Sequence, residues 1–433
     1  MIDQTLPCLL IIEKDPHHFL AAFLAAQSLS LPICLGNPGW KKPELDLVLE
    51  QIRPRWLWRD QQCFATESLY SIQTPSGSIG DPFPDPTGWI LIPTGGSSGQ
   101  LRFAIHTRQT LSAAVAGFRD FFQAQVIHAV CVLPLYHVSG LMQFWRCYLT
   151  KGNFIVTPWK ELEAGKIPLL DPSHFFLSLV PTQLARLLKH QDLLAWLQSF
   201  RAILLGGAPA WAELLSEARM QGIPLAPTYG MTETAAQICT LKPEFFLAGK
   251  SGVGQPLSHA NITILNEHNQ LVSAQEIGRI HIQTNSLALG YFPHPWLTHK
   301  AFTSGDLGYW DPQGFLHIVG RVDDCLISGG EKVMASEVEA VIRASGYVED
   351  IAIVGIGDPE WGDLLVAIYV PKAKDFILME LQDHLRQHLS AHKQPKRWMA
   401  TPYIPRNPQG KINRPHLRQW IESLPAESIG SNL

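Results

Sequence analysis

The sequence predicts an α/β protein with a large N-terminal domain of parallel-type sheets and helices, a β-rich subdomain, and a small α+β C-terminal domain. Three observations predict this class. Apolar runs of strand length alternate with helical patterns in the N-terminal part, short strand-like segments follow in residues 279–320, and a helix, a hairpin and a second helix come after residue 330. With 433 residues, 46% of them hydrophobic, the chain can build one large core and a smaller one.

The first predicted helix and strand come from "FLAAFLAAQSL" and "LPICLG". Residues 19–40 carry no formal charge, but polar residues and a proline interrupt them, which favours a buried helix over a membrane span. The interrupting residues are Gln27, Ser28, Ser30, Pro32 and Asn37. The N-terminus has Asp3 first and Lys14 only late, so it lacks the basic segment of a signal peptide.

Further strands are predicted along the large domain and the β-rich subdomain. In the large domain they are "GWILIP", "AVCVLPL", "HFFLSLVP", "FRAILLGG" and "PLAPTYG". Helical patterns such as "ELLSEARMQG" lie between several of these runs, and this alternation indicates a parallel sheet. In the subdomain the predicted strands are "RIHIQTN", "SLALGYF" and "FLHIVGR".

The C-terminal domain is predicted to span residues 323–433, after a first domain of residues 1–322. Its first helix, "ASEVEAVIRAS", has Ser336 and Glu339 in the spacing of a capping box. "DIAIVGIGDPEWGDLLVAIYVP" predicts a hairpin. An amphipathic helix is predicted from Leu378, Leu381, Leu385 and Leu389.

Charge and cysteine content narrow the class of function. The 34 basic and 38 acidic residues give a net charge of −4 without long blocks of either sign, so no nucleic-acid surface is indicated and small molecules are the expected partners. The seven cysteines are scattered and form no C-x-x-C pair. This favours neither a disulfide framework nor a zinc site, and it predicts a reducing, cytoplasmic environment.

The segment "LIPTGGSSGQLRFAIHT", residues 91–107, allows three hypotheses: a flexible linker, a nucleophile elbow or a phosphate-binding loop. Gly95, Ser97 and Gly99 satisfy the G-x-S-x-G pattern of a hydrolase elbow with Ser97 as nucleophile. An elbow needs a helix directly after its serine, whereas "LRFAIHT" alternates like a strand. The pattern of a Walker A loop is absent. Successive small residues can instead turn their backbone N–H groups inward and bind an anion, with Arg102 adding charge.

This loop resembles the phosphate loop of the adenylate-forming enzymes, the family of acyl- and aryl-CoA ligases, luciferases and peptide-synthetase adenylation domains. The family pattern is T-S-G-T-T-G-x-P-K-G, and "TGGSSGQLRFA" keeps its spacing but has Leu101 for the proline and Arg102 for the lysine. The resemblance implies ATP contacts from Thr94, Gly96, Ser97, Ser98, Gly99 and Arg102.

Two later motifs resemble the nucleotide pocket of the family. "LLGGAPA" supplies Gly207, Ala208 and Pro209, and "PTYGMTET" supplies Thr228, Tyr229, Gly230, Met231, Thr232 and Glu233. The resemblance implies that Tyr229 stacks on adenine, that Thr232 contacts phosphate and that Glu233 helps hold Mg²⁺, for which a carboxylate oxygen is a suitable ligand.

Three more motifs follow in the family's order. "TSGDLGYWD" resembles the ribose-binding motif, which implies that Asp306 accepts the ribose hydroxyls. "GRVDDCLISGGEKV" resembles the hinge motif, with Arg321 near ribose and phosphate, Asp323 as the pivot between the domains, and Gly329 and Gly330 beside the thiol arm of coenzyme A. "PRNPQGKINR" places Lys411 in the position of the catalytic lysine.

The acid-binding residues are predicted from two segments. "LPLYHVSGLMQFWR" and "FLSLVPTQLARLL" resemble the o-succinylbenzoate–CoA ligase branch of the family. His137 and Ser139 are expected to face an aromatic acid, and the alternative that His137 is a packed core histidine stays open. The predicted acid-binding set is His137, Ser139, Gln143, Gly207 and Gly230. A second carboxylate of the acid needs a polar partner, for which Arg146, Gln143 and Gln183 are unranked candidates.

The resemblance implies an acid–CoA ligase that uses ATP, Mg²⁺ and coenzyme A, with o-succinylbenzoate as the acid, in menaquinone or phylloquinone synthesis. Alternatives are another aryl- or acyl-CoA ligase, a light-emitting oxidase or a non-catalytic relative. A free-standing adenylation domain would need an acidic residue for the ammonium of an amino acid, and none occurs between Asp120 and Glu161. A hydrolase with Ser97 as nucleophile is the remaining alternative.

Overall fold

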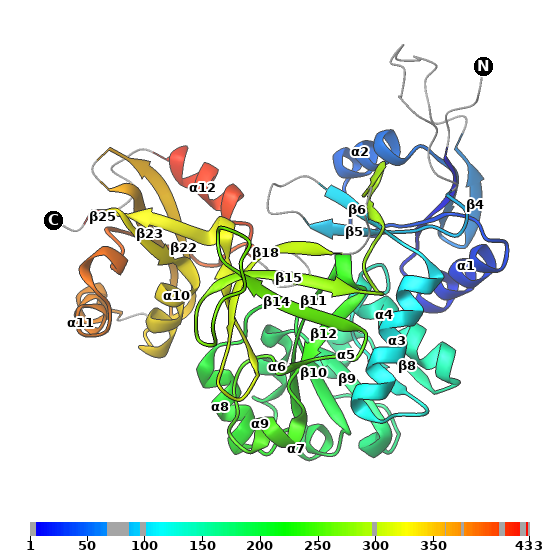
Figure 1. Ribbon diagram of the computed structural model, residues 1–433, viewed down its shortest axis with the longest axis horizontal. Coiled ribbons are helices and arrows are strands. Elements are labelled where there is room, and N and C mark those ends of the chain that lie inside the picture. Colours follow the sequence, from blue (N-terminus) through cyan, green and yellow to red (C-terminus); the bar gives the residue numbers. More distant parts are fainter. Residues whose placement is uncertain are drawn as a thin grey trace, which may run out of the picture.

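The structure is a computed structural model that describes residues 6–66, 86–95, 101–296, 301–359, 361–373, 376–406, 412–424 and 430–431. Four sheets with helices packed on them confirm the predicted α/β class. The C-terminal sheet and its helices lie to one side of the rest of the chain, at the left of Figure 1. The predicted division at residue 323 falls within a short 3-10 turn, η4 (Val322–Asp324), and stays a prediction.

The first sheet has eight strands in the order β17-β16-β6-β5-β2-β1-β3-β4. Their bounds are β1 Leu6–Ile12, β2 Ile33–Leu35, β3 Pro54–Arg59, β4 Gln62–Ala65, β5 Ile90–Gly95, β6 Leu101–His106, β16 Gly290–Tyr291 and β17 His294–Pro295. The central strands β5, β2, β1 and β3 are parallel, and the flanking pairs are antiparallel. The helices in this part are α1 (Pro16–Ser28) and α2 (Lys42–Ile52).

Helix α1 confirms the buried helix predicted from the uncharged N-terminal stretch. The Asp15 carboxylate caps it by accepting hydrogen bonds from the backbone N–H groups of His17 and His18. Phe19 and Phe23 are fully buried in the core. Among the residues that the structure describes, no helix is both long and apolar enough to cross a bilayer.

The second sheet has seven strands in the order β13-β12-β11-β10-β9-β7-β8. Their bounds are β7 His128–Cys131, β8 Phe154–Val156, β9 Phe175–Leu179, β10 Ala202–Leu205, β11 Leu225–Met231, β12 Ala236–Thr240 and β13 Gln255–Pro256. The pairs from β8 to β11 are parallel, as predicted. The helices are α3 Arg108–Phe122, α4 Val138–Thr150, α5 Trp159–Glu163, α6 Pro181–Leu187, α7 Gln191–Gln198, α8 Ala212–Met220 and α9 Pro243–Leu247.

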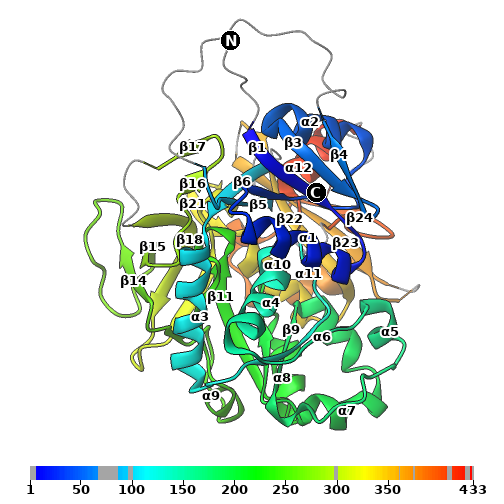
Figure 2. The same ribbon diagram turned by 90° about the vertical axis from the view of Figure 1, so that its right-hand side faces the viewer.

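Helices α1, α3 and α4 join the two sheets into one core. Their buried side chains, among them Phe118 and Trp145, share a cluster with residues of both sheets, such as Ile90 of β5 and Ala202 of β10. Figure 2 shows α3 and α4 running beside the seven-stranded sheet, below the eight-stranded one. Helix α4 follows β7, so its N-terminal end lies on the side of the sheet where the parallel strands end, and ligands of α/β sheets usually bind there.

The β-rich region is an antiparallel sheet in the order β14-β15-β18-β19. Its strands are β14 Ala260–Leu265, β15 Gly278–Thr284, β18 Phe302–Trp310 and β19 Leu316–Arg321. It therefore begins before residue 279, earlier than predicted. The short strand predicted for "SLALGYF" is present only at Gly290–Tyr291, and its assignment to the β-rich region was wrong, because it pairs with β6 of the first sheet.

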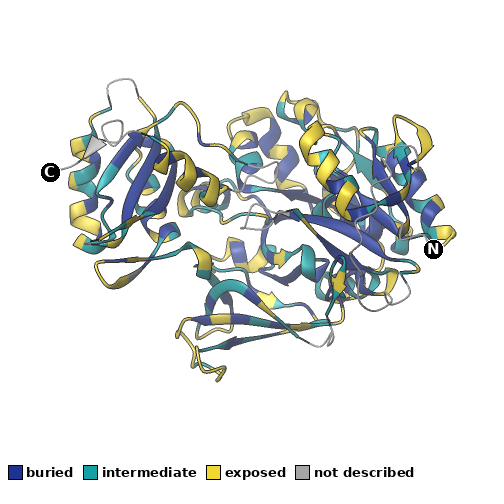
Figure 3. Cartoon of the chain, turned by 90° about the horizontal axis from the view of Figure 1, so that it is seen from above, coloured by how far each residue is buried: buried dark blue, intermediate teal, exposed yellow. Residues whose placement is uncertain are grey.

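The C-terminal sheet contains β20 Cys325–Ser328, β21 Glu331–Met334, β22 Val348–Asp358, β23 Gly362–Pro371, β24 Arg397–Ala400 and β25 Gly430–Ser431. Its helices are α10 Ala335–Ala344, α11 Leu378–His388 and α12 Arg414–Glu422. The predicted hairpin is β22 and β23, and α11 buries Leu381 and Leu385 as its leucine spacing predicted. Figure 3 shows this buried sheet between more exposed helices.

The predicted capping box at Ser336 was wrong. Helix α10 begins at Ala335, and the Ser336 hydroxyl donates to the Val319 carbonyl of β19 at 2.9 Å. The Glu339 carboxylate is buried and accepts the backbone N–H of Ile353. Both side chains therefore make contacts outside the helix instead of capping it.

Candidate active site

The segment Gly207–Pro209 lies beside the end of β11. Strands β10 and β11 are parallel with Leu205 opposite Pro227, so both end at the same edge of the sheet. A Cβ atom on Gly206 would come within 2.6 Å of Thr228 Oγ1, and Gly207 has a φ of +82°. Glycines therefore let this turn pass directly against the strand that carries Tyr229.

A chain of polar contacts runs from Tyr229 to the predicted hinge. The Tyr229 ring is buried, and its hydroxyl donates to Asp306 Oδ2 at 2.7 Å. Arg321 Nη1 donates to Asp306 Oδ1 at 3.2 Å, and Arg321 Nη2 lies 3.5 Å from Asp323 Oδ2. Burial and the neighbouring Asp306 charge raise the pKa of Tyr229 well above its usual value, so this hydroxyl remains a donor.

The structure thus brings together four predicted residues that are widely separated in sequence. The Asp306 carboxylate still has lone pairs for ribose hydroxyls, because each carboxylate oxygen can accept two hydrogen bonds. Arg321 is fixed beside it by two carboxylates. The arrangement suits a nucleotide whose sugar lies against Asp306 of β18 and Arg321 of β19, and whose base lies at the end of β11.

Glu233 lies in the 3-10 turn η3 (Thr232–Thr234), directly after β11. Its carboxylate accepts a short hydrogen bond from the Tyr291 hydroxyl. Tyr291 belongs to β16, which pairs with β6, and the Arg102 guanidinium lies over its ring at 5.4 Å from the centroid. Tyr291 therefore connects Glu233 with the strand that follows the phosphate loop. A strand was predicted for "SLALGYF", which contains Tyr291, but the sequence reasoning did not single this residue out.

His106 holds the backbone of Thr232, and it was also missed. The ring is fully buried at the end of β6, with Nε2 at 2.7 Å from the Thr232 carbonyl and Nδ1 at 2.9 Å from Thr110 Oγ1. A carbonyl only accepts, so Nε2 carries the proton. Burial lowers the pKa of His106 to about 4, which keeps the ring neutral.

The phosphate loop itself lies outside the described residues, including Gly96, Ser97, Ser98 and Gly99. The strands on either side are described: β5 and β6 form an antiparallel pair with Thr94 opposite Arg102 and Gly95 opposite Leu101. Thr94 is buried and Arg102 is exposed. A hydrolase elbow requires a helix directly after the nucleophile, whereas the described element after Ser97 is the strand β6. The structure therefore does not favour Ser97 as a nucleophile.

Three of the five predicted acid-binding residues, His137, Ser139 and Gln143, lie at the start or in the first half of α4. His137 is the N-cap residue, and Gln143 Nε2 donates to the Ser139 carbonyl at 3.0 Å. The rings of Tyr136 and His137 lie 4.4 Å apart. Gly230 belongs to β11, and a Cβ atom there would come within 2.0 Å of the Ala236 carbonyl oxygen, so only glycine fits.

Gly329 and Gly330 form the tight turn between β20 and β21, with φ values of +61° and +81°. Lys411 lies outside the described residues, and the described residues on either side of 407–411 make the following contacts. Arg406 pairs with Ile412 in a β-bridge, and Arg414 binds Asp324 at 3.1 Å and Glu339 at 2.6 Å. Arg414, three residues after Lys411 in the sequence, therefore binds the residue next to the predicted pivot, Asp323.

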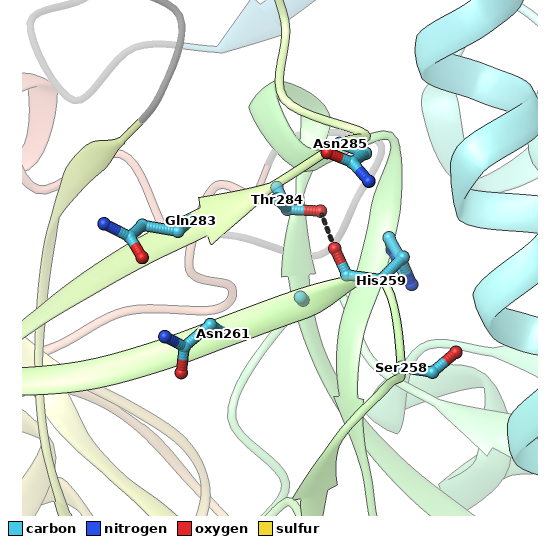
Figure 4. Close-up of a pocket in the computed structure, with 7 residues that line it drawn as sticks. Ser258, His259, Asn261, Gln283, Thr284 and Asn285 are labelled. Atoms are coloured by element: carbon cyan, nitrogen blue, oxygen red, sulfur yellow. Dashed lines mark hydrogen bonds between the residues drawn. The ribbon is translucent and has the colours of Figure 1, made fainter.

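No group of three or more His, Cys, Asp or Glu side chains that could bind a metal by themselves occurs in the described part of the chain. Glu233 could supply one oxygen ligand to Mg²⁺ beside phosphate oxygens, as magnesium bound with nucleotides usually has few protein ligands. A cavity of about 440 Å³ lies elsewhere, over β14 and β15 (Figure 4), and none of the predicted site residues lines it.

The fold and this site define an enzyme that binds adenine nucleotide. The chain belongs to the AMP-binding enzyme family: that family matches residues 8–292, and the C-terminal domain of AMP-binding enzymes matches residues 337–411.

Among curated relatives, the 2-succinylbenzoate–CoA ligase of Geobacillus sp. (strain WCH70) is 33% identical over 298 residues, which cover 67% of this chain and 60% of that protein. The matched segment thus spans less than two thirds of that relative.

Two solved structures of o-succinylbenzoate CoA synthetase from Bacillus subtilis, each 25% identical to this chain, share its fold. The complex with the acyl-adenylate intermediate has a TM-score of 0.80 and covers 96% of this chain and 88% of the other. The complex with ATP and a magnesium ion has a TM-score of 0.80, with 95% and 89% covered.

Proposed function

We propose that this chain is an AMP-forming acid–CoA ligase that converts o-succinylbenzoate into o-succinylbenzoyl-CoA in menaquinone or phylloquinone synthesis. The observation that carries the proposal is the contact chain from Tyr229 through Asp306 to Arg321, next to the Glu233 turn. The family membership and the named relatives support it.

In the first half-reaction the acid carboxylate attacks the α-phosphorus of ATP. A carboxylate oxygen–phosphorus bond forms, the bond to the β-phosphate breaks, and pyrophosphate leaves with the electron pair. Tyr229 and the Gly207–Pro209 segment hold adenine, and Asp306 and Arg321 hold ribose. The phosphate loop and Arg102 bind the departing pyrophosphate. Lys411 stabilises the negative charge shared by the carboxylate and the α-phosphate. Mg²⁺ beside Glu233 neutralises phosphate charge when bound.

In the second half-reaction the thiol of coenzyme A attacks the acyl carbon. A carbon–sulfur bond forms, the carbon–oxygen bond to phosphate breaks, and AMP leaves. We propose that the C-terminal domain turns about Asp323 so that the Gly329–Gly330 turn replaces Lys411 beside the acyl group. Rotation of this kind is a recurrent way to run two reactions at one site, and it can limit turnover.

The choice of acid rests on His137, the N-cap residue of α4, and on Ser139 in the first turn of that helix. An amino acid is a poorer candidate, because residues 121–160 contain no acidic residue to bind its ammonium group. The seven cysteines are all free, which supports a reducing cytosol as the location.

The experiment that tests the proposal is a pyrophosphate-release assay with o-succinylbenzoate, simple benzoates, fatty acids and amino acids, each with and without coenzyme A. We expect ATP-dependent release with o-succinylbenzoate and thioester formation once coenzyme A is added. Pyrophosphate release with amino acids but not with o-succinylbenzoate would contradict the proposed substrate. Thioester formation from another acid but not from o-succinylbenzoate would contradict it as well. ATP-independent ester cleavage would contradict the proposed reaction.

A further inference from the structure

A small cavity lies where the C-terminal half of α1, the start of α3 and the second half of α4 meet. Its volume is about 170 Å³, and it is lined by Leu24, Gln27, Ser28, Arg108, Trp145 and Tyr148. At roughly 30 Å³ per water molecule, this space equals about six waters. Pockets for drug-sized ligands measure roughly 300 Å³ or more, so a nucleotide does not fit. The cavity has room for a small ion or for a molecule with a single ring.

The cavity is separate from the candidate active site. The phosphate loop follows Gly95 of β5, whereas α3 follows the other end of the β5–β6 pair, where Ile90 lies opposite His106. The loop and the start of α3 are therefore at opposite edges of the first sheet. On α4, Trp145 follows Ser139 by six residues, which is about 9 Å along the axis and about 120° round the helix. The two side chains therefore lie on different faces of α4.

Two buried hydrogen-bond donors belong to residues that line the cavity. Trp145 is 1% exposed, and its indole Nε1 is buried without a hydrogen-bond partner among the described residues. The amide Nε2 of Gln27 is buried and unpartnered in the same way. An indole N–H only donates, and a buried donor that has lost its water is costly unless an acceptor replaces it. Two such donors at one cavity indicate a ligand that accepts hydrogen bonds.

The charge at the cavity indicates that this ligand is an anion. Among the described residues that line it, Arg108 is the only charged one. None of the ion pairs within the described part of the chain includes Arg108. It is the first residue of α3, so the helix dipole adds positive potential beside it. The guanidinium presents its N–H groups in a planar fork that matches a carboxylate. One positive charge without an acidic neighbour suits a ligand with a single negative charge.

The rest of the cavity wall is apolar or offers no donor. The Tyr148 ring stacks on Trp145 with the centroids 5.6 Å apart and is 48% exposed, and Leu24 is half-buried beside it in the cavity lining. The Ser28 hydroxyl donates to the Ala25 carbonyl at 2.7 Å and is therefore not available to an anion. A ligand with an apolar body next to its negative charge matches this wall better than an inorganic anion does.

We propose that this cavity is a second ligand site, which binds a small carboxylic acid with an apolar body. The carboxylate accepts hydrogen bonds from Arg108, Gln27 Nε2 and Trp145 Nε1, and the apolar body packs on Leu24 and Tyr148. The ligand is not the acid that the enzyme activates, because the cavity lies away from the phosphate loop. The inference goes beyond the proposed function and does not depend on which acid is activated.

The test is a calorimetric titration of the full chain with benzoate as the probe and inorganic phosphate as the comparison anion. The proteins are the wild type and Arg108→Met. Benzoate that binds at the acid site does so in both proteins, so the difference between the two titrations reports the cavity. We expect a benzoate site in the wild type whose Kd rises about 10-fold or more in Arg108→Met, because a hydrogen-bonded charge pair is lost. Phosphate should bind more weakly than benzoate.

Arg119→Met is the matched control for Arg108→Met. Arg119 lies near the other end of α3, and its Nη2 donates to Gln125 Oε1 at 2.8 Å, away from the cavity. This control should bind benzoate as the wild type does. Pyrophosphate release should stay close to wild type in both arginine variants, since neither residue belongs to the proposed active site.

Gln27→Leu separates ligand binding from folding. The change replaces an unpartnered buried amide by an apolar group of similar size, so we expect the Tm of the ligand-free variant to equal that of the wild type or to exceed it. Benzoate should bind to the cavity about 10-fold more weakly, because one N–H group that donates to the carboxylate is lost. A donor that serves only the fold would give the opposite pair of results, a lower Tm and unchanged binding.

Three results would overturn the inference. The first is the same benzoate titration in the wild type, Arg108→Met and Gln27→Leu. The second is a site that depends on Arg108 but binds phosphate and not benzoate, which would exclude a carboxylic acid as the ligand. The third is a Gln27→Leu protein with a lower Tm and unchanged benzoate binding, which would assign Gln27 to the fold alone.

Discussion

Two aromatic side chains hold the Thr232–Glu233 turn in place without belonging to the predicted motifs. Tyr291 donates to the Glu233 carboxylate, and His106 donates to the Thr232 carbonyl. Both bonds join the turn after β11 to the eight-stranded sheet that carries the phosphate loop. The position of Glu233 relative to that loop therefore depends on these two residues.

Tyr291→Phe tests the orientation of Glu233. The change removes one hydroxyl and keeps the ring that Arg102 contacts, so we expect the Mg²⁺ concentration needed for half-maximal adenylation to rise by about 10- to 100-fold, as for other residues that orient a metal ligand. A titration of pyrophosphate release against Mg²⁺ measures this. An unchanged titration with a lowered Tm would show that Tyr291 acts only through stability.

His106→Gln tests the neutral buried imidazole. The pKa of His106 is about 4 in the folded protein, against 6.5 ordinarily, so between these values the unfolded chain binds more protons and stability falls as the pH falls. Above pH 6.5 this contribution is fully present. We expect the wild type to lose stability from pH 6.5 towards 4 more steeply than His106→Gln does, by at most about 1.4 kcal/mol per pH unit.

Urea unfolding at several pH values checks this prediction. Glutamine can still donate its amide N–H to the Thr232 carbonyl, so the variant should retain most of its activity near neutral pH. Identical pH profiles of stability for the two proteins would contradict the neutral, buried state of His106.

The sequence could not reveal these two residues. Motif residues such as Asp306 and Tyr229 could be chosen because a known family has the same letters at the same spacing. Tyr291 lies 58 residues from its partner Glu233, and His106 lies 126 residues from Thr232. Such contacts are decided by which strands become neighbours, and the pairing of β16 with β6 was not predictable from local periodicity.

At the scale of elements, the predicted hinge joins β19 to the hairpin of β20 and β21. Arg414 ties the start of α12 to Asp324 and Glu339, and through them to this junction. The local signals predicted β22, β23 and α11 well. The two strands are continuous apolar runs that are buried on both faces, and the leucines of α11 share one buried face. The capping box failed because tertiary contacts of Ser336 and Glu339 override a local preference.

Lys411→Ala tests the proposed catalytic lysine. Losing one aimed donor typically lowers kcat by about 10² to 10³, and we expect this loss in adenylation only. Thioester formation from supplied acyl-adenylate should be nearly unaffected, because Lys411 is not needed once the phosphate bond has formed. Single-turnover assays of the two half-reactions measure both rates. Equal losses in both would contradict the role.

Asp323→Pro tests the hinge and should have the opposite effect. Proline restricts φ, and a strained backbone costs about 1–3 kcal/mol, or roughly 5- to 150-fold in rate. We expect this loss in thioester formation, with adenylation close to wild type, since only the second half-reaction requires the rotation. Normal overall turnover in this variant would remove the argument for a pivot at Asp323.

At the scale of the whole molecule, three sheets of the chain converge on the proposed nucleotide site. Strand β11 supplies Tyr229 and the Glu233 turn, the four-stranded sheet supplies Asp306 and Arg321, and the eight-stranded sheet supplies Arg102 and Tyr291. The class of fold followed from the alternation of strands and helices. The convergence of the three sheets did not follow from this alternation, because the order of strands in each sheet depends on long-range packing. Only the family resemblance indicated that these residues lie together.

The central claim is that the acid is activated as an acyl-adenylate, and isotope transfer tests it most directly. The acid is labelled with oxygen-18 in the reacting carboxylate and turned over with ATP and coenzyme A. Attack on the α-phosphorus predicts that one labelled oxygen per turnover appears in AMP and the other in the thioester carbonyl. Label in inorganic phosphate with ADP as the product, or AMP without label, would contradict the account.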